Sequence, residues 1–261
     1  GNRVMQFPLG MFGIAMGTAL LPTISHQTAQ NNISQMKETL AFSIRLVLFI
    51  IVPSTVGLVL LSNPTIRLLF ESGSFDARAT MRASQTLMAY SFGLFAYSGM
   101  KLVVVAFYSL QDTKTPVKIG VICMIMNIIF NCLLMVPFRE MGIAFATSLS
   151  NTMNFLFLYF ILEKKIGRIG TMRGPLIKII TASLLMGVIV YLSSRWITID
   201  VFLWEKLNIC LQMAIIITIA TISYLVFCFL LRIHEAHKGA AFVVGWIRQN
   251  IARWHHARNP R

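Results

Sequence analysis

Seven apolar segments dominate this chain, and each is long enough to cross a lipid bilayer as a helix. None of them contains an Asp or Glu residue. A helix rises 1.5 Å per residue, so about 20 apolar residues span the ~30 Å hydrocarbon core. The sequence therefore predicts an all-α, polytopic membrane helix bundle with seven transmembrane helices. The segments are 4–24, 41–62, 84–110, 117–137, 142–162, 175–195 and 206–231.

The distribution of charge predicts how these helices are oriented. Only 12% of the residues are charged, against roughly 25% in a soluble domain. The net charge of +14 comes from Lys and Arg residues in the connections, which indicates membrane topology and argues against nucleic acid as a partner. If Gly1 is outside, the connections 25–40, 111–116 and 163–174 and the C-terminal tail are cytoplasmic. Roughly twice as many Lys and Arg residues then lie inside as outside.

Two connections carry local structural signals. We expect 25–40, which is polar, to be irregular before a short helix leads into Arg45. On the outer side, Ile66, Leu69 and Phe70 have the spacing of a short helix lying at the membrane interface. Asp76 is placed to cap the helix that follows.

Two cations are candidates for binding an anion. Arg3 precedes an apolar segment, so it either extends to the membrane surface or binds an anion at the rim of a cavity between helices. Lys101 lies inside the third apolar segment, where an unpaired charge costs about 2.5–3.5 kcal/mol at the bilayer centre. It needs a wet cavity or a partner, unless it lies close enough to the inner surface to reach water.

Polar residues inside the spans are few. Asn127 and Asn131 lie one helical turn apart, and Thr147 and Ser148 follow in the next span. Side chains of this kind usually form hydrogen bonds between membrane helices, and ion coordination is the rarer alternative. The four cysteines lie in apolar spans without metal-ligand spacing, so we expect neither a metal centre nor disulfides from them.

Three motifs in the first 120 residues resemble one known family. They are Asn2-Arg3-x-x-x-Phe7-Pro8-Leu9-Gly10, Leu69-Phe70-Glu71-x-Gly73-x-Phe75-Asp76 and Phe107-Tyr108-Ser109-Leu110-Gln111-Asp112-Thr113-Lys114-Thr115-Pro116. In these motifs the chain resembles the C-terminal half of the bacterial lipid II flippases of the MurJ (MviN) family. The resemblance implies a two-lobed, fourteen-helix transporter of the multidrug/oligosaccharidyl-lipid/polysaccharide exporter superfamily, with these as its eighth to fourteenth helices.

The resemblance also implies a function. Such proteins are not enzymes; they move the undecaprenyl-pyrophosphate-linked peptidoglycan precursor from the inner to the outer leaflet of the bacterial cytoplasmic membrane by alternating access. The partners implied are that precursor, membrane lipids and a missing N-terminal lobe, since Gly1 lies within an apolar segment. No cofactor is expected, and the coupling is left open between sodium and the membrane potential.

The family's site residues are carried over position by position. An arginine matching Arg3 lines the central cavity, and we expect Lys101 to face the same cavity as a second substrate-binding cation. Some members bind sodium at positions matching Asn127, Asn131 and Thr147, together with a backbone carbonyl. Here Asn131 replaces an aspartate, which makes sodium coupling doubtful.

The resemblance further implies that the last two helices hold the polyprenyl tail in a groove. Leu184, Val188, Ile215 and Ile219 offer apolar faces at helical spacing for it, although a packed interface would have the same pattern. A tryptophan at Gly187 is then expected to block the groove without preventing folding. The expected division is residues 1–163 as lobe helices, 164–232 as the groove helices and 233–261 as a basic amphipathic cytoplasmic tail.

The same residues also bear on three other possible functions. An exporter of another polyprenyl-linked glycan, or of small cations, could share this fold, but a cation exporter should carry carboxylates in its spans. A membrane phosphatase would need a cluster of His, Arg and acidic residues at one face, and the sequence has none. The protein could also be a scaffold that transports nothing, and only the candidate cavity cations argue against this.

Overall fold

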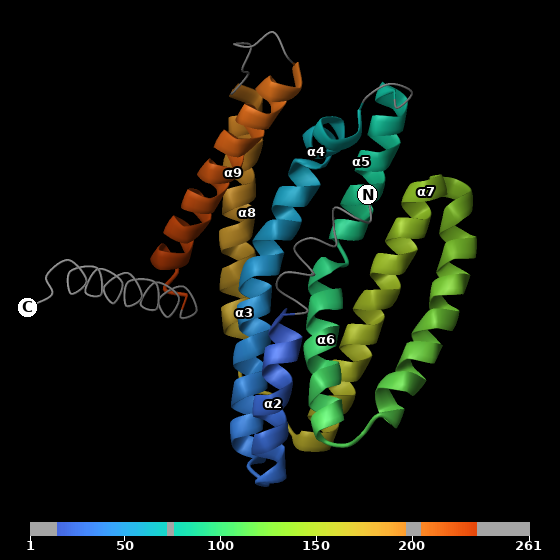
Figure 1. The fold of residues 1–261 in the computed structure, drawn as a ribbon, viewed down its shortest axis with the longest axis vertical. Helices are drawn as coiled ribbons and strands as arrows, with labels where there is room; N and C mark the ends of the chain where they lie inside the picture. Colours follow the sequence, from blue (N-terminus) through green and yellow to red (C-terminus); the bar gives the residue numbers. More distant parts are fainter. Residues whose placement is uncertain (1–14, 72–75, 197–204, 234–261) are drawn as a thin grey trace, which may run out of the picture.

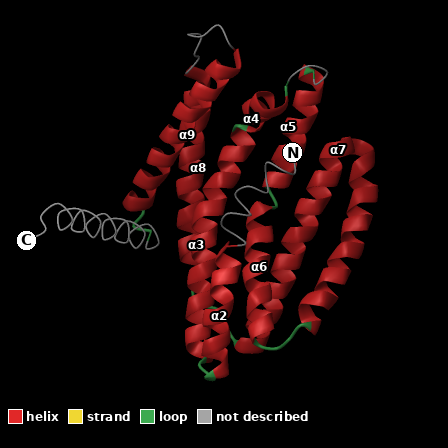
Figure 2. Cartoon of the chain, in the orientation of Figure 1, coloured by secondary structure: helices red, strands yellow, loops and turns green. Residues whose placement is uncertain are grey.

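The computed structural model describes residues 15–71, 76–196 and 205–233, and in these ranges the chain forms a bundle of helices without strands (Figure 1 and Figure 2). Among the described residues, five helical stretches are long and apolar enough to cross a membrane. The prediction of an all-α polytopic bundle is confirmed. The helices are α2 (Ala15–Ala29), α3 (Ile33–Leu60), α4 (Ser62–Phe70), α5 (Ala77–Ser91), α6 (Leu94–Ser109), α7 (Lys114–Ile166), α8 (Arg173–Trp196) and α9 (Glu205–Leu230).

Helix α7 contains two of the predicted spans. It is 53 residues long, but Arg139 has φ 50° and ψ −128°, which is not helical, and the chain reverses there (Figure 1). Pro137 precedes the reversal and lacks a backbone N–H, which weakens the helix at this point. The two arms then lie so close that a Cβ atom at Gly142 would overlap the carbonyl oxygen of Leu134. The outer connection predicted at 138–141 is therefore a tight reversal.

The third predicted span is a broken helix made of α5 and α6. At the break, the N–H of Gly93 donates to Tyr90 O instead of continuing the helical ladder to Ala89. The hydroxyl of Ser148 on α7 donates to Ala89 O at 2.7 Å and satisfies the carbonyl that the break leaves open. A Cβ atom at Gly93 would lie 2.8 Å from Ser148 Cα, so only glycine permits this approach. The break and the helix contact therefore depend on each other.

The connection predicted as irregular at 25–40 is a tight turn. Helix α2 continues to Ala29 and α3 begins at Ile33. Asn31 has a left-handed φ of 56°, which asparagine tolerates better than most residues, and the Asn32 side chain caps α3 by accepting from Gln35 N at 3.1 Å. The helix predicted to lead into Arg45 is present, as the first part of α3. The prediction of an irregular segment before it was wrong, because the loss of hydropathy marks the end of the apolar segment and not the end of the helix.

The predicted short helix and the predicted cap at Asp76 are confirmed. Helix α4 contains the apolar residues Ile66, Leu69 and Phe70, of which Ile66 is fully buried. Asp76 caps α5, accepting from Ala79 N at 2.9 Å. Pro116 lies in the first turn of α7, where a missing N–H costs little.

Two apolar cores hold the helices together. The first joins α2, α3, α6 and the second arm of α7 around fully buried residues such as Ile44, Leu102 and Leu158. The second packs α8 and α9 against the far half of α3 through residues such as Met186, Val190 and Ile216. The outward faces of α8 and α9 remain apolar and exposed, as expected for helices that contact lipid.

A hydrogen bond from Tyr224 fastens α9 to α3. Pro53 has no N–H, so the carbonyl of Phe49 four residues earlier loses its partner in the α3 ladder. The hydroxyl of Tyr224 donates to that carbonyl at 2.6 Å, and the Tyr224 and Phe49 rings lie 5.3 Å apart. The proline therefore creates the acceptor that positions α9.

The connections alternate between two ends of the bundle, as the predicted topology requires. The turns at 30–32 and 110–113 share one end with the connection at 167–172 (Figure 1). There Thr28 donates to Ser109 Oγ at 3.4 Å, and a Cβ atom at Gly167 would lie 3.1 Å from Lys37 Nζ. We call this the turn end. Helix α4 and the α7 reversal lie at the opposite end.

Candidate functional site

Lys101 lies on α6 and is partly buried. Its Nζ atom lies 5.0 Å from the centroid of the Tyr97 ring, a distance at which the ring's negative face attracts a cation. Tyr97 is one turn toward the start of α6, so the ammonium points away from Ser109 and the turn end. This direction argues against a lysine that reaches for the nearer surface. An aromatic partner was not foreseen, although the i, i+4 spacing was visible in the sequence.

Arg3 lies outside the described residues, and so does most of the predicted tail at 233–261. Their predicted roles remain predictions. Whether Lys101 shares a cavity with Arg3 is likewise a prediction.

Asn127, Asn131 and Thr147 of α7 form hydrogen bonds within their own arms. Asn131 Nδ2 donates to Asn127 Oδ1 at 2.9 Å, and Thr147 Oγ1 donates to Ile143 O at 2.9 Å. Asn131 Oδ1 is buried and has no partner among the described residues. The expectation of bonding between helices is met by Ser148, which bonds to α5, but not by the amide pair. Both amides are half-buried and lie on the less exposed face of the first arm, whose other side chains are largely exposed.

These residues do not fit a sodium site on their own. Hard cations bind best to carboxylate and carbonyl oxygens, and the described residues contain no cluster of three or more acidic, His or Cys groups. Asn127 Oδ1 and Ile143 O already accept hydrogen bonds, whereas Asn131 Oδ1 has no partner among the described residues.

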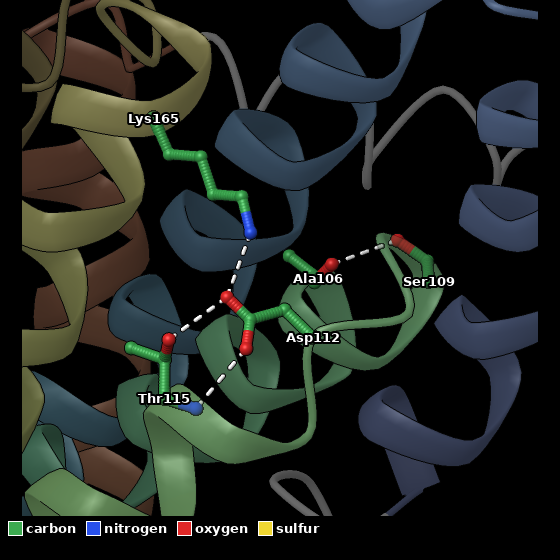
Figure 3. Close-up of polar contacts among 5 residues, drawn as sticks. All are labelled: Ala106, Ser109, Asp112, Thr115 and Lys165. Atoms are coloured by element: carbon green, nitrogen blue, oxygen red, sulfur yellow. Dashed lines mark hydrogen bonds and ion pairs between the residues drawn. The ribbon is translucent and has the colours of Figure 1, made fainter.

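A polar network fastens the turn between α6 and α7 (Figure 3). Asp112 Oδ1 accepts from Thr115 N at 3.0 Å, while Asp112 Oδ2 accepts from Thr115 Oγ1 at 2.8 Å and from Lys165 Nζ at 2.7 Å. Gln111 takes a left-handed φ of 57° to close the turn. Lys165 lies in the last turn of α7, so the bond joins the two ends of this helix at the turn end. The hydrogen bond from Lys165, followed by those from Thr115, lowers the pKa of Asp112 from 3.8 to about 2.

A pocket of about 810 Å³ opens between α3, the second arm of α7 and the start of α8. Arg45, Glu163, Arg168 and Thr171 line one end of it, and the remaining walls are almost entirely apolar. Sequence reasoning missed this pocket. The available signal was Arg45, a cation placed four residues inside the apolar segment 41–62.

The predicted groove residues are on the outer faces of α8 and α9. Leu184, Val188 and Ile215 are 59%, 56% and 42% exposed, and Ile219 is half-buried. They do not line the pocket described above. A groove role for them stays a prediction.

Gly187 does not face a groove between α8 and α9. A Cβ atom there would lie 2.8 Å from Val56 Cγ1, so Gly187 packs against α3. Ala182 is also fully buried, within the core that joins α8 and α9 to α3. The expectation that a tryptophan at Gly187 leaves folding intact is therefore wrong, since its side chain would meet the α3 helix.

Comparison with known protein families shows which family the chain belongs to. The family model described as "Lipid II flippase MurJ" matches residues 1–211. The chain belongs to the MurJ family. As a MurJ family member with membrane-spanning helices, it is a multi-pass protein of the inner membrane.

Individual relatives support membership of the MurJ family. The probable lipid II flippase MurJ of Vibrio cholerae serotype O1 is 38% identical over 158 residues, which are 60% of this chain and 30% of the relative. The Haemophilus influenzae relative is 33% identical over 214 residues, 77% of this chain and 42% of its own length. The Rhizobium tropici relative is 30% identical over 258 residues, 97% of this chain and 46% of its own length. The chain therefore spans less than half the length of these relatives.

The fold also matches a solved MurJ structure. A lipid II flippase MurJ in an inward closed conformation superposes with a TM-score of 0.72 at 27% identity, covering 88% of this chain and 46% of that one. The resemblance noted from the sequence motifs is confirmed.

Proposed function

We propose that this chain forms the second half of a transporter that moves the lipid-linked peptidoglycan precursor from the inner to the outer leaflet by alternating access. The observation that carries the proposal is the match of the MurJ family model to residues 1–211. The likeness to an inward closed MurJ structure supports it, because that fold neighbour is named for a conformation of a transport cycle. The transporter performs no chemistry on the precursor.

Arg3 and Lys101 are proposed to bind the pyrophosphate of the precursor. Arginine suits this task because its planar guanidinium donates paired hydrogen bonds to two phosphate oxygens. Lys101 supports the proposal through its position, since a cation within a membrane span is expensive. The Tyr97 ring attracts it but supplies no counter-charge, so an anionic ligand would stabilise it further.

The polyprenyl tail is proposed to lie along the exposed apolar stripe of α8 and α9 that includes Leu184, Val188, Ile215 and Ile219. Such a stripe offers contact to a long hydrocarbon without a polar group to desolvate. The turn end is proposed to be cytoplasmic, with the C-terminus on the same side, because most Lys and Arg residues follow that assignment.

We also propose that transport by this protein does not depend on sodium bound at the amide pair. Asn127, Asn131 and Thr147 lack a carboxylate among them, and two of the oxygens nearby already accept hydrogen bonds. Coupling to the membrane potential is the alternative that this leaves.

The decisive experiment is complementation of a strain depleted of its own flippase by the full-length protein that contains this chain. We expect Arg3→Ala to abolish growth while the amount of protein in the membrane stays normal. Arg3→Lys should rescue growth poorly, because lysine keeps the charge but lacks the planar guanidinium that donates paired hydrogen bonds. Arg78→Ala, on an exposed part of α5, is the matched control and should complement fully. Full complementation by Arg3→Ala would remove Arg3 from the substrate site.

A second candidate is export of another polyprenyl-linked glycan on the same fold. Reconstituted vesicles separate the two candidates, because each labelled lipid-linked glycan can be offered in turn and its outer-leaflet fraction measured. The proposal requires the peptidoglycan precursor to be moved and recovered chemically unchanged. Movement of another glycan instead would replace it.

A further inference from the structure

The pocket between α3, α7 and α8 divides into a charged end and an apolar end. Arg45, Glu163 and Arg168 line the charged end. Arg168 belongs to the connection at 167–172, which lies beside the start of α3, since a Cβ atom at Gly170 would be 3.5 Å from Ala41 Cβ. The charged end is therefore at the turn end of the bundle.

The apolar end reaches toward the middle of the membrane. On α3 the lining continues from Arg45 to Val52, seven residues or about 10 Å along the axis. Phe155 lies two turns of α7 before Glu163, and Phe95 is at the start of α6, far from the turn end. A molecule filling this pocket must be charged at the membrane surface and apolar below it.

The charges favour an anion at the surface. The one carboxylate in the lining, Glu163, accepts from Tyr159 OH and from Ile169 N at 3.1 Å each through its Oε1. The guanidinium groups of Arg45 and Arg168 also line the pocket, so the lining carries one more positive charge than negative. Lys37 and Lys164 lie close to the same connection and add to the positive potential.

We propose that this pocket binds an anionic phospholipid of the bilayer, with its phosphate between Arg45 and Arg168 and an acyl chain along the apolar wall. The volume of about 810 Å³ is within the ~300–1,000 Å³ of pockets that enclose small organic ligands. Guanidinium groups bind phosphate through paired hydrogen bonds. The site is separate from the residues proposed to bind the precursor and its tail, so it goes beyond the proposed function.

The test is lipid retention by the full-length protein that contains this chain, purified in mild detergent and measured by native mass spectrometry. Dioleoylphosphatidylglycerol is titrated in parallel with dioleoylphosphatidylcholine. We expect the double variant Arg45→Gln/Arg168→Gln to bind phosphatidylglycerol about tenfold more weakly and to lose the preference over phosphatidylcholine. Arg168→Gln alone, on an exposed connection, should give part of the effect with no threat to folding.

A second variant addresses the acyl chain. Leu156→Trp fills the apolar wall without changing charge and is expected to weaken retention of both lipids. Arg82→Gln on α5 and Ile222→Trp on α9 are matched controls on exposed positions elsewhere and should retain lipid normally. Unchanged phosphatidylglycerol binding in the double variant, or an equal loss in Arg82→Gln, would overturn the proposal, as would unchanged retention in Leu156→Trp.

Discussion

The hydroxyl of Tyr224 allows a direct test of how α9 is held against α3. Tyr224→Phe removes only that hydroxyl and keeps the ring beside Phe49. The carbonyl of Phe49 is then left without a donor, because Pro53 supplies no N–H. Hydrogen bonds between membrane helices contribute about 0.6 kcal/mol on average and up to about 1.7 kcal/mol, while an unsatisfied buried carbonyl costs about 1–3 kcal/mol. We expect a loss of about 1–2 kcal/mol.

The measurement is the free energy of unfolding of the full-length protein in mixed detergent and SDS. Tyr191→Phe, an exposed tyrosine on α8, is the control and should change it little. The informative background is Pro53→Ala, because the alanine restores an N–H that can bond to the carbonyl of Phe49. There Tyr224→Phe should cost less than about 0.5 kcal/mol. An equal cost in both backgrounds would refute the claim that the proline creates the acceptor for Tyr224.

Three further predictions concern other parts of the chain. The pKa of Asp112 is lowered from 3.8 to about 2, so its carboxylate stabilises the fold above pH ~4, and this contribution is lost as the pH falls toward 2. Asp112→Asn should remove this loss from a titration of the free energy of unfolding between pH ~4 and ~2. An unchanged titration in the variant would contradict the role of Asp112. Asn131→Asp should make transport in vesicles respond to sodium where the parent does not, and a sodium-dependent parent would disprove the proposal of sodium independence. Gly187→Trp should lower the amount of protein in the membrane. Leu184→Trp should accumulate normally but transport more slowly, and normal transport by this variant would contradict the proposal that the polyprenyl tail lies along this stripe.

The arrangement of spans was predictable because the bilayer imposes it. The length of the apolar segments, the absence of Asp and Glu within them and the charged connections between them predicted the seven spans and the alternation of connections between two ends. The short-range cap at Asp76 was also readable, since a cap needs only residues three positions apart.

Contacts between residues far apart in the chain were not predictable. Ser148 bonds to α5 across 59 positions, Lys165 to Asp112 across 53 and Tyr224 to α3 across 175. Each partner looks like an ordinary polar or aromatic residue in the sequence, and only the packing of helices reveals its acceptor. Gly187 was misjudged for the same reason, because the sequence does not say which neighbouring helix a small residue faces.

The ends of α7 determine how its two arms can move. The chain joins the arms at Arg139, and the bond between Lys165 and Asp112 joins them again at the other end. Together they close residues 112–165 into a loop, so a hinge that spreads the arms must first break that bond. With the bond intact, a change of conformation in this region is a rotation of the whole hairpin against its neighbours.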